Sequence, residues 1–192
     1  MSKTHFMLDL ETLGTKPGCI ILSIGCAQFD PLTGDIGKTF YTEINQRESE
    51  EIGLTSDPKT LAFWEMQDDA AKDLLNRTKA DKTHPVQACI QLADFIYEVR
   101  PLLRKRIIWA NSPSFDCDIL AHLFKTVELE IPWEFYNEQD CRTLVELGRS
   151  LDIDPKRDMP FTGTPHQALD DAIHQAKYIS AIYQHIHGLK GH

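Results

Sequence analysis

The first 44 residues contain three apolar stretches separated by short polar segments. Residues 5–10 form a short apolar run, residues 19–29 form a longer one, and residues 38–44 alternate apolar and polar side chains. Residues 30–35 (Asp-Pro-Leu-Thr-Gly-Asp) have the composition of a turn between the second and third stretches. Because short turns join antiparallel neighbours, the pattern predicts three antiparallel strands.

The pattern then changes to the helical period, in which apolar residues recur every three or four positions. Asp57 followed by Pro58 has the form of a helix N-cap with proline at the first helical position. The remaining elements are expected, in order, as helices at 58–64 and 85–98, a strand at 107–110, a helix at 114–126, an optional short strand, and helices at 141–151 and 166–187. Residues 153–165, which include three prolines, are expected to form a mobile loop.

This order of elements predicts a mixed α/β fold. One central β-sheet, with three antiparallel strands followed by parallel ones, would be flanked by α-helices. The chain has 192 residues, of which 42% are hydrophobic, and this suits one core. We therefore expect residues 1–192 to form a single domain.

Composition and charge exclude several classes of protein. Acidic residues outnumber basic ones by 29 to 20, and the net charge of -9 disfavours a protein that coats duplex DNA with a basic surface. The chain contains no run of about 18 apolar residues, the length needed to span a membrane. The first apolar run contains acids, unlike a signal peptide. The five cysteines are scattered, which disfavours disulfides or a zinc site. We expect a cytoplasmic protein with no membrane association.

The first stretch with candidate chemistry is the Asp-x-Glu triplet formed by Asp9 and Glu11. Residues two apart on a strand share a face, so both side chains should point the same way. Two neighbouring carboxylates repel each other unless a cation lies between them. The alternative is a strand end whose acids lie in solvent, but the flanking apolar residues Leu8 and Leu10 make this a poor surface segment.

The second stretch surrounds Asp116, which follows the strand predicted at 107–110. Open α/β sheets bind their ligands at the carboxyl ends of such strands. The alternative is that Asp116 is a first-turn acid favoured by the helix dipole. Asp118 competes for the same role, but two residues further along a helix it would face away.

The third stretch contains His166, Asp170 and Asp171. Helical spacing would pair His166 with Asp170, four residues on, if His166 were itself helical. Pro165 argues against this, because the preceding chain reads as loop. A loop histidine followed by first-turn acids is the alternative, and spacing alone does not choose between the two acids.

Together the three stretches suit a two-metal phosphoryl-transfer site. Divalent cations such as Mg²⁺ prefer oxygen ligands and use a few protein carboxylates together with substrate phosphates. A histidine can exchange protons near neutral pH, so His166 would accept the proton of the attacking water.

The same residues resemble the motifs of a known family. Asp9-x-Glu11, the segment from Asn111 to Phe115-Asp116, and His166-x-x-x-x-Asp171 are similar to the three motifs of the DEDDh, or DnaQ-like, 3′–5′ exonucleases. The resemblance implies a ribonuclease-H-like fold, two Mg²⁺ or Mn²⁺ ions, and release of nucleoside 5′-monophosphates from 3′ ends.

The resemblance also implies roles for individual residues. It makes Asp171, rather than Asp170, the fourth acidic ligand. The implied catalytic set is Asp9, Glu11, Asp116, His166 and Asp171, of which the four acids bind metal. The implied substrate contacts are Thr12, Leu13, Gly14, Trp64, Asn111 and Phe115.

Two further segments resemble one branch of this family, which contains a T-even phage single-strand exonuclease and a mycobacterial exoribonuclease. They are residues 60–67 (Thr-Leu-Ala-Phe-Trp-Glu-Met-Gln) and residues 137–143 (Asn-Glu-Gln-Asp-Cys-Arg-Thr). Phe63 departs from the branch, which has Trp there, and we interpret Phe63 and Trp64 as a core anchor in preference to a base-stacking pair. Arg142 would either hold a phosphate or pair with Asp140.

The expected partner is nucleic acid with a free 3′ end, preferably single-stranded. DNA is favoured over RNA only by the phage resemblance, which also suggests a phage or prophage origin. An exoribonuclease and a non-catalytic module that binds nucleic-acid ends are the alternatives. An apolar face formed by Tyr178, Ile182 and Ile186 could serve a homodimer, while His185, His187 and His192 are expected to be exposed.

Overall fold

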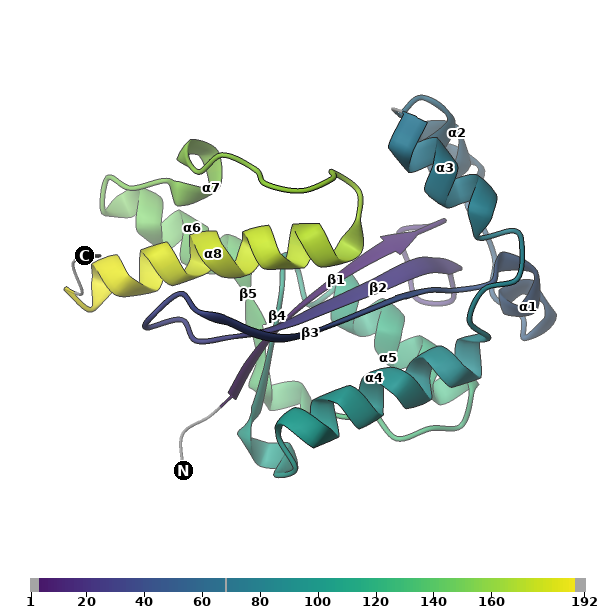
Figure 1. The fold of residues 1–192 in the computed structure, drawn as a ribbon, viewed down its shortest axis with the longest axis horizontal. Coiled ribbons are helices and arrows are strands. Elements are labelled where there is room, and N and C mark those ends of the chain that lie inside the picture. Colours follow the sequence, from purple (N-terminus) through teal and green to yellow (C-terminus); the bar gives the residue numbers. More distant parts are fainter. Residues whose placement is uncertain (1–3, 68, 189–192) are drawn as a thin grey trace.

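A computed structural model describes residues 4–67 and 69–188. Its central sheet has five strands in the spatial order β3-β2-β1-β4-β5 (Figure 1). β1, β2 and β3 are antiparallel neighbours, whereas β4 and β5 run parallel to β1. The predicted mixed sheet is therefore confirmed. The strands are β1 (Thr4–Thr12), β2 (Ile21–Phe29), β3 (Ile36–Glu43), β4 (Arg106–Ala110) and β5 (Glu138–Asp140).

Helices cover both faces of this sheet. The helices are α1 (Gln46–Glu51), α2 (Pro58–Glu65), α3 (Asp69–Arg77), α4 (Pro85–Val99), α5 (Asp116–Thr126), α6 (Cys141–Ser150), α7 (Pro155–Asp158) and α8 (Ala168–Ile186). α8 lies over one face together with α6 and α7, and α4 and α5 lie over the other (Figure 1). α2 and α3 lie near the carboxyl end of β1 (Figure 1).

The alternation of β1 decides which of its side chains meet which helices. Phe6, Leu8 and Leu10 are buried in the core cluster that also contains residues of α4 and α5. Met7 is buried in the second cluster, on the side of α8. Because strand residues two apart share a face, Asp9 and Glu11 continue the row that starts at Met7 and point toward α8.

One glycine allows the amino end of α8 to approach the sheet closely. Gly25 of β2 lies opposite Asp9 in the antiparallel register. A Cβ atom at Gly25 would lie 2.2 Å from the carbonyl carbon of Ala168, the first residue of α8. The absence of a side chain at Gly25 therefore sets how near the first turn of α8 comes to Asp9.

Three helices are missing from the prediction. α1 and α3 are both rich in charged side chains, and α1 has no apolar period that would reveal it. The first turn of α1 instead depends on Asn45, whose side chain accepts a hydrogen bond from the backbone N–H of Glu48 at 3.1 Å. The predicted loop at 153–165 contains the short helix α7, which is capped by Asp154.

The apolar face proposed for a homodimer is not available. Tyr178 and Ile182 are buried in the core cluster beneath α8, and only Ile186 is exposed. The prediction of this face is wrong because α8 buries it against its own sheet. His185 and His187 are exposed, as expected, and His192 lies outside the described residues.

Two expectations from composition concern cross-links and membranes. All five cysteines are buried, and none of them is paired in a disulfide. Within residues 4–67 and 69–188, none of the helices is long and apolar enough to cross a bilayer.

Candidate active site

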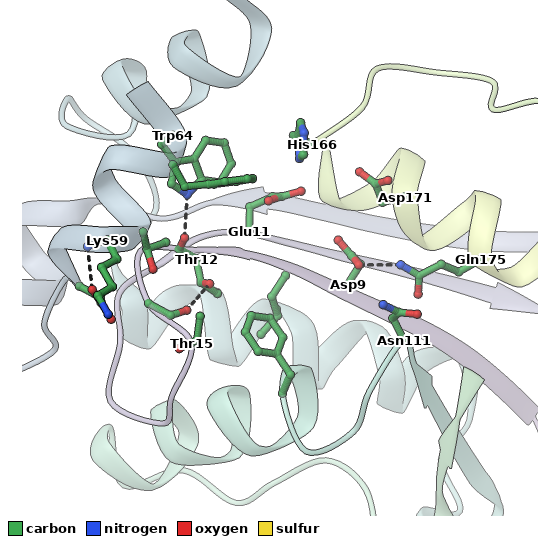
Figure 2. Close-up of a pocket in the computed structure, with 16 residues that line it drawn as sticks. Asp9, Glu11, Thr12, Thr15, Lys59, Trp64, Asn111, His166, Asp171 and Gln175 are labelled. Atoms are coloured by element: carbon green, nitrogen blue, oxygen red, sulfur yellow. Dashed lines mark hydrogen bonds between the residues drawn. The ribbon is translucent and has the colours of Figure 1, made fainter. Parts of the chain in front are cut away.

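Three carboxylates meet between the sheet and the first turn of α8. Asp9 and Glu11 point from β1 toward Asp171, and all three side chains face a common space (Figure 2). One oxygen from each can be chosen so that all lie within 4.8 Å of one another. Divalent cations bind oxygen at about 2.0–2.6 Å, so one ion could contact all three. The shared strand face predicted for Asp9 and Glu11 is thus present.

Asp116 joins this group from the carboxyl end of β4. It is the first residue of α5, its side chain is buried, and only 3% of the residue is exposed. The backbone N–H of Leu10 donates a hydrogen bond to Asp116 Oδ1 at 3.3 Å. This bond ties the start of α5 to β1, next to Asp9. Asp118 is exposed on the same helix and faces away, as expected.

The two candidate acids of α8 have different environments. Asp170 Oδ2 accepts a hydrogen bond from the backbone N–H of Thr164 at 2.8 Å, and its carboxyl group lies against Gly163. Asp171 is the acid that meets Asp9 and Glu11. The structure therefore brings Asp171, and not Asp170, into the cluster.

His166 lies outside the helix, in the left-handed backbone region with φ of 60°. α8 begins only at Ala168, with Gln167 as its N-cap, so helical spacing from His166 does not apply. The His166 ring packs edge-on against Phe63 and Trp64, with centroids 6.2 and 6.0 Å away. This places the imidazole above the carboxylates (Figure 2).

Burial makes these acids costly to ionise together. It raises the pKa of Glu11 to about 8, with repulsion from Asp171 and Asp116 adding to the shift. Burial, followed by repulsion from Asp116, raises the pKa of Asp9 well above its ordinary value. Burial likewise raises the pKa of Asp116 to about 7, although backbone donors oppose the shift. A bound cation would remove this cost, because opposite charge favours the carboxylate form.

The pKa shifts predict how stability depends on pH without metal. The folded pKa values of about 8 for Glu11 and about 7 for Asp116 exceed their ordinary values of 4.5 and 3.8. Above about pH 4 the folded protein thus binds more protons than the unfolded chain, and the free energy of unfolding should fall until about pH 8. Urea unfolding in EDTA at a series of pH values measures this. Saturating Mg²⁺ should flatten the curve, and a curve that rises from pH 5 to 8 in EDTA would contradict the prediction.

Gln175 is a site residue that the sequence analysis missed. It is only 9% exposed, and its Nε2 donates a hydrogen bond to Asp9 Oδ1 at 2.7 Å (Figure 2). Its position four residues after Asp171 on the same helix face is the signal that could have revealed it. Gln175 Oε1 and Asp171 Oδ2 are buried without a hydrogen-bond partner. Unpaired buried acceptors beside clustered acids fit a site that receives a cation with its waters.

The acids form one wall of a cavity of about 700 Å³. Of the predicted substrate contacts, five line it: Thr12, Gly14, Trp64, Asn111 and Phe115. Leu13 does not, because its side chain is buried in the core cluster beneath the sheet, so its prediction as a contact is not supported. The cavity also contains residues that were not predicted: Thr15, Asp57, Lys59 and Thr60.

Trp64 and Phe63 have separate roles. Trp64 is 2% exposed, and its indole Nε1 donates to the carbonyl oxygen of Thr12 at 2.9 Å (Figure 2). It therefore anchors α2 to the end of β1, as the core-anchor interpretation expects. Phe63 is 48% exposed and lines the cavity, so the interpretation is wrong for Phe63, whose ring is available to a ligand.

The fold is shared with solved nucleases, one of which is described as a DEDDh family member. The nuclease domain of 3′hExo, a DEDDh family member bound to rAMP, is 16% identical, with a TM-score of 0.62 over 98% of this chain and 94% of that chain. Cell-death related nuclease 4 is 14% identical, with a TM-score of 0.66 over 97% and 65%. E. coli exonuclease I in complex with a dT13 oligonucleotide is 12% identical, with a TM-score of 0.66 over 97% and 43%.

These likenesses show the fold, and this chain spans less than half of exonuclease I. The sequence model of the Rv2179c-like 3′-5′ exoribonuclease domain matches residues 4–183. The chain belongs to this family, and the protein is a 3′–5′ exonuclease. Among curated proteins, no sequence matches the chain.

Proposed function

We propose that this exonuclease acts on single-stranded nucleic acid and releases nucleoside 5′-monophosphates one at a time from the 3′ end. The observation that carries the proposal is the meeting of Asp9, Glu11, Asp171 and His166 on one cavity of about 700 Å³. That volume falls in the range of small-molecule sites, about 300–1,000 Å³. It is large enough for one terminal nucleotide.

The chemistry follows from the four acids and the histidine. Two Mg²⁺ or Mn²⁺ ions, held by Asp9, Glu11, Asp116 and Asp171, would stabilise negative charge on the scissile phosphate. His166 would take the proton of the attacking water, since its ring lies over the carboxylates on the open side of the cavity. Gln175 would hold Asp9 in its ligating orientation through the 2.7 Å hydrogen bond.

The preference for single strands rests on the cavity walls. A terminal base entering beside Phe63 could stack on its exposed ring, and stacking contributes roughly 1–3 kcal/mol per base. A duplex end offers no such base until it unpairs.

RNA is the favoured substrate. The family description names an exoribonuclease, and the 3′hExo relative is bound to rAMP. These supports outweigh the phage resemblance that favoured DNA. The dT13 complex of exonuclease I indicates that a DEDDh fold also accepts DNA, so both sugars belong in the test.

The test is digestion of 5′-labelled single-stranded RNA, single-stranded DNA and blunt duplexes of one sequence, with the released mononucleotides identified in parallel by chromatography. Reactions contain Mg²⁺, Mn²⁺ or EDTA, with the Asp9→Asn variant as the inactive control. We expect a ladder that shortens from the 3′ end, nucleoside 5′-monophosphates as the first products, and faster decay of single-stranded RNA. Internal fragments without mononucleotides, or equal rates on blunt duplexes and single strands, would contradict the proposal.

A further inference from the structure

A second, smaller cavity of about 190 Å³ adjoins the first one at the acid cluster. The residues shared by both cavities are Asp9, Leu10, Asn111 and Phe115. Ser112, Asp116 and Arg142 line only the smaller cavity. It therefore continues the active site past Asp116, on the side away from Phe63 and Trp64.

Three neighbouring parallel strands end around this cavity. Asp9 lies on β1, Asn111 directly follows β4, and Arg142 follows β5 after a single residue. Adjacent strands lie about 4.8 Å apart, so β1 and β5 are separated by roughly 10 Å. Across β1, β4 and β5, the side chains therefore follow one another in the order carboxylate, amide and guanidinium.

Arg142 makes no close ion pair in the described part of the chain, although its positive charge acts on Asp116 and opposes the rise in the pKa of that carboxyl. Its side chain is exposed, and no carboxylate there forms an ion pair with it. Asp140, the partner that the sequence offered, is used as the N-cap of α6 and accepts from the backbone N–H of Thr143 at 2.6 Å. Of the two roles considered for Arg142, pairing with Asp140 is therefore absent.

Asn111 turns a donor toward the same cavity. Lys156 Nζ donates to Asn111 Oδ1 at 3.2 Å, which leaves the amide nitrogen on the side of Asp9 (Figure 2). Lys156 also adds a second positive charge behind Asn111. The net charge of the chain is -9, so positively charged and amide donors gathered beside an acidic site indicate that an anionic group binds there.

We propose that Arg142, assisted by the Asn111 amide, binds the phosphate one nucleotide upstream of the scissile bond. This inference rests on the proposed function. With the terminal nucleotide in the large cavity and the scissile phosphate at the acids, the strand leaves across the ends of β4 and β5. A guanidinium there forms charge-assisted hydrogen bonds to a phosphodiester oxygen. Arg142 is then a residue that makes the enzyme favour strands with a second phosphate.

The test uses three substrates that differ in this phosphate. They are a trinucleotide of the preferred sugar, the same trinucleotide with an uncharged methylphosphonate at the second linkage from the 3′ end, and the 4-nitrophenyl ester of thymidine 5′-monophosphate, which has one diester only. Wild type should lose about tenfold or more in kcat/KM when the second linkage is uncharged. Arg142→Gln should lose a similar factor on the native trinucleotide and distinguish the two trinucleotides by less than about threefold.

Lys125→Gln, on the exposed last turn of α5, removes one positive charge elsewhere and should behave as wild type. The assignment is wrong if Arg142→Gln still discriminates against the methylphosphonate as wild type does, or if it loses as much on the nitrophenyl ester as on the trinucleotide. A wild type that hydrolyses none of the three substrates contradicts the proposed function instead. Trinucleotide binding in Ca²⁺ then still decides the role of Arg142, since the variant should bind both trinucleotides equally.

Discussion

Replacing Asp9 with Asn is expected to reduce 3′-end hydrolysis by about 1,000-fold or more. Metal ions supply several kcal/mol of charge stabilisation in phosphoryl transfer, and each 1.4 kcal/mol corresponds to a factor of ten in rate. Asp9 lies at the centre of the cluster, because it is repelled by Asp116, Glu11 and Asp171 together. Asn keeps the oxygen that Gln175 binds but removes the charge that would hold a cation. The measurement is kcat on single-stranded RNA at saturating Mg²⁺.

The same variant should be more stable than wild type when metal is absent. Removing one of several buried acids relieves their repulsion, so the urea midpoint in EDTA at pH 8 should rise. The matched control is Asp170→Asn, which keeps an acceptor for the Thr164 backbone N–H. It should retain activity within about threefold, as surface changes usually do. An inactive Asp170→Asn together with an active Asp171→Asn would mean that the wrong acid is assigned to the cluster.

Much of this cluster could be predicted because it depends on local geometry. The two-residue period of a strand puts Asp9 and Glu11 on one face. The strand before Asn111 puts Asp116 near the carboxyl ends of the strands, where its carboxylate accepts a hydrogen bond from the backbone N–H of Leu10. These relations hold within a single element or between neighbouring strands, so a hydrophobic pattern suffices to find them.

The choice between Asp170 and Asp171 could not be made in this way. It depends on the left-handed backbone of His166, which delays the start of α8 and so changes the direction of both acids. A single loop residue with positive φ leaves no periodic trace in a sequence. The resemblance to a known family, and not spacing, pointed to Asp171.

Residues that act through distant contacts were also missed or misplaced. Gln175 meets Asp9 across 166 positions of sequence, and the close approach that allows it depends on Gly25. Leu13, which the family resemblance gave as a substrate contact, instead packs its side chain into the core cluster. Such effects belong to tertiary packing, which a one-dimensional pattern does not contain.

Replacing His166 with Asn is expected to reduce kcat by about 10²- to 10⁴-fold, the usual contribution of a general base. Asn is the matched substitution, because the backbone of His166 has φ of 60° and Asn adopts the left-handed region more readily than most residues. The change therefore removes the imidazole without adding backbone strain. The change loses the ring contacts with Phe63 and Trp64, but Trp64 keeps its hydrogen bond to the carbonyl oxygen of Thr12, so the fold should be retained.

Metal binding separates this variant from those of the acids. His166 is not among the clustered carboxylate ligands, so Mg²⁺ should raise the melting temperature of His166→Asn as much as that of wild type, whereas Asp9→Asn should respond weakly. If His166→Asn is inactive but Mg²⁺ raises its melting temperature as in wild type, His166 transfers a proton and does not bind the metal. If the variant keeps more than about a tenth of the wild-type kcat, a residue other than His166 accepts the proton of the attacking water.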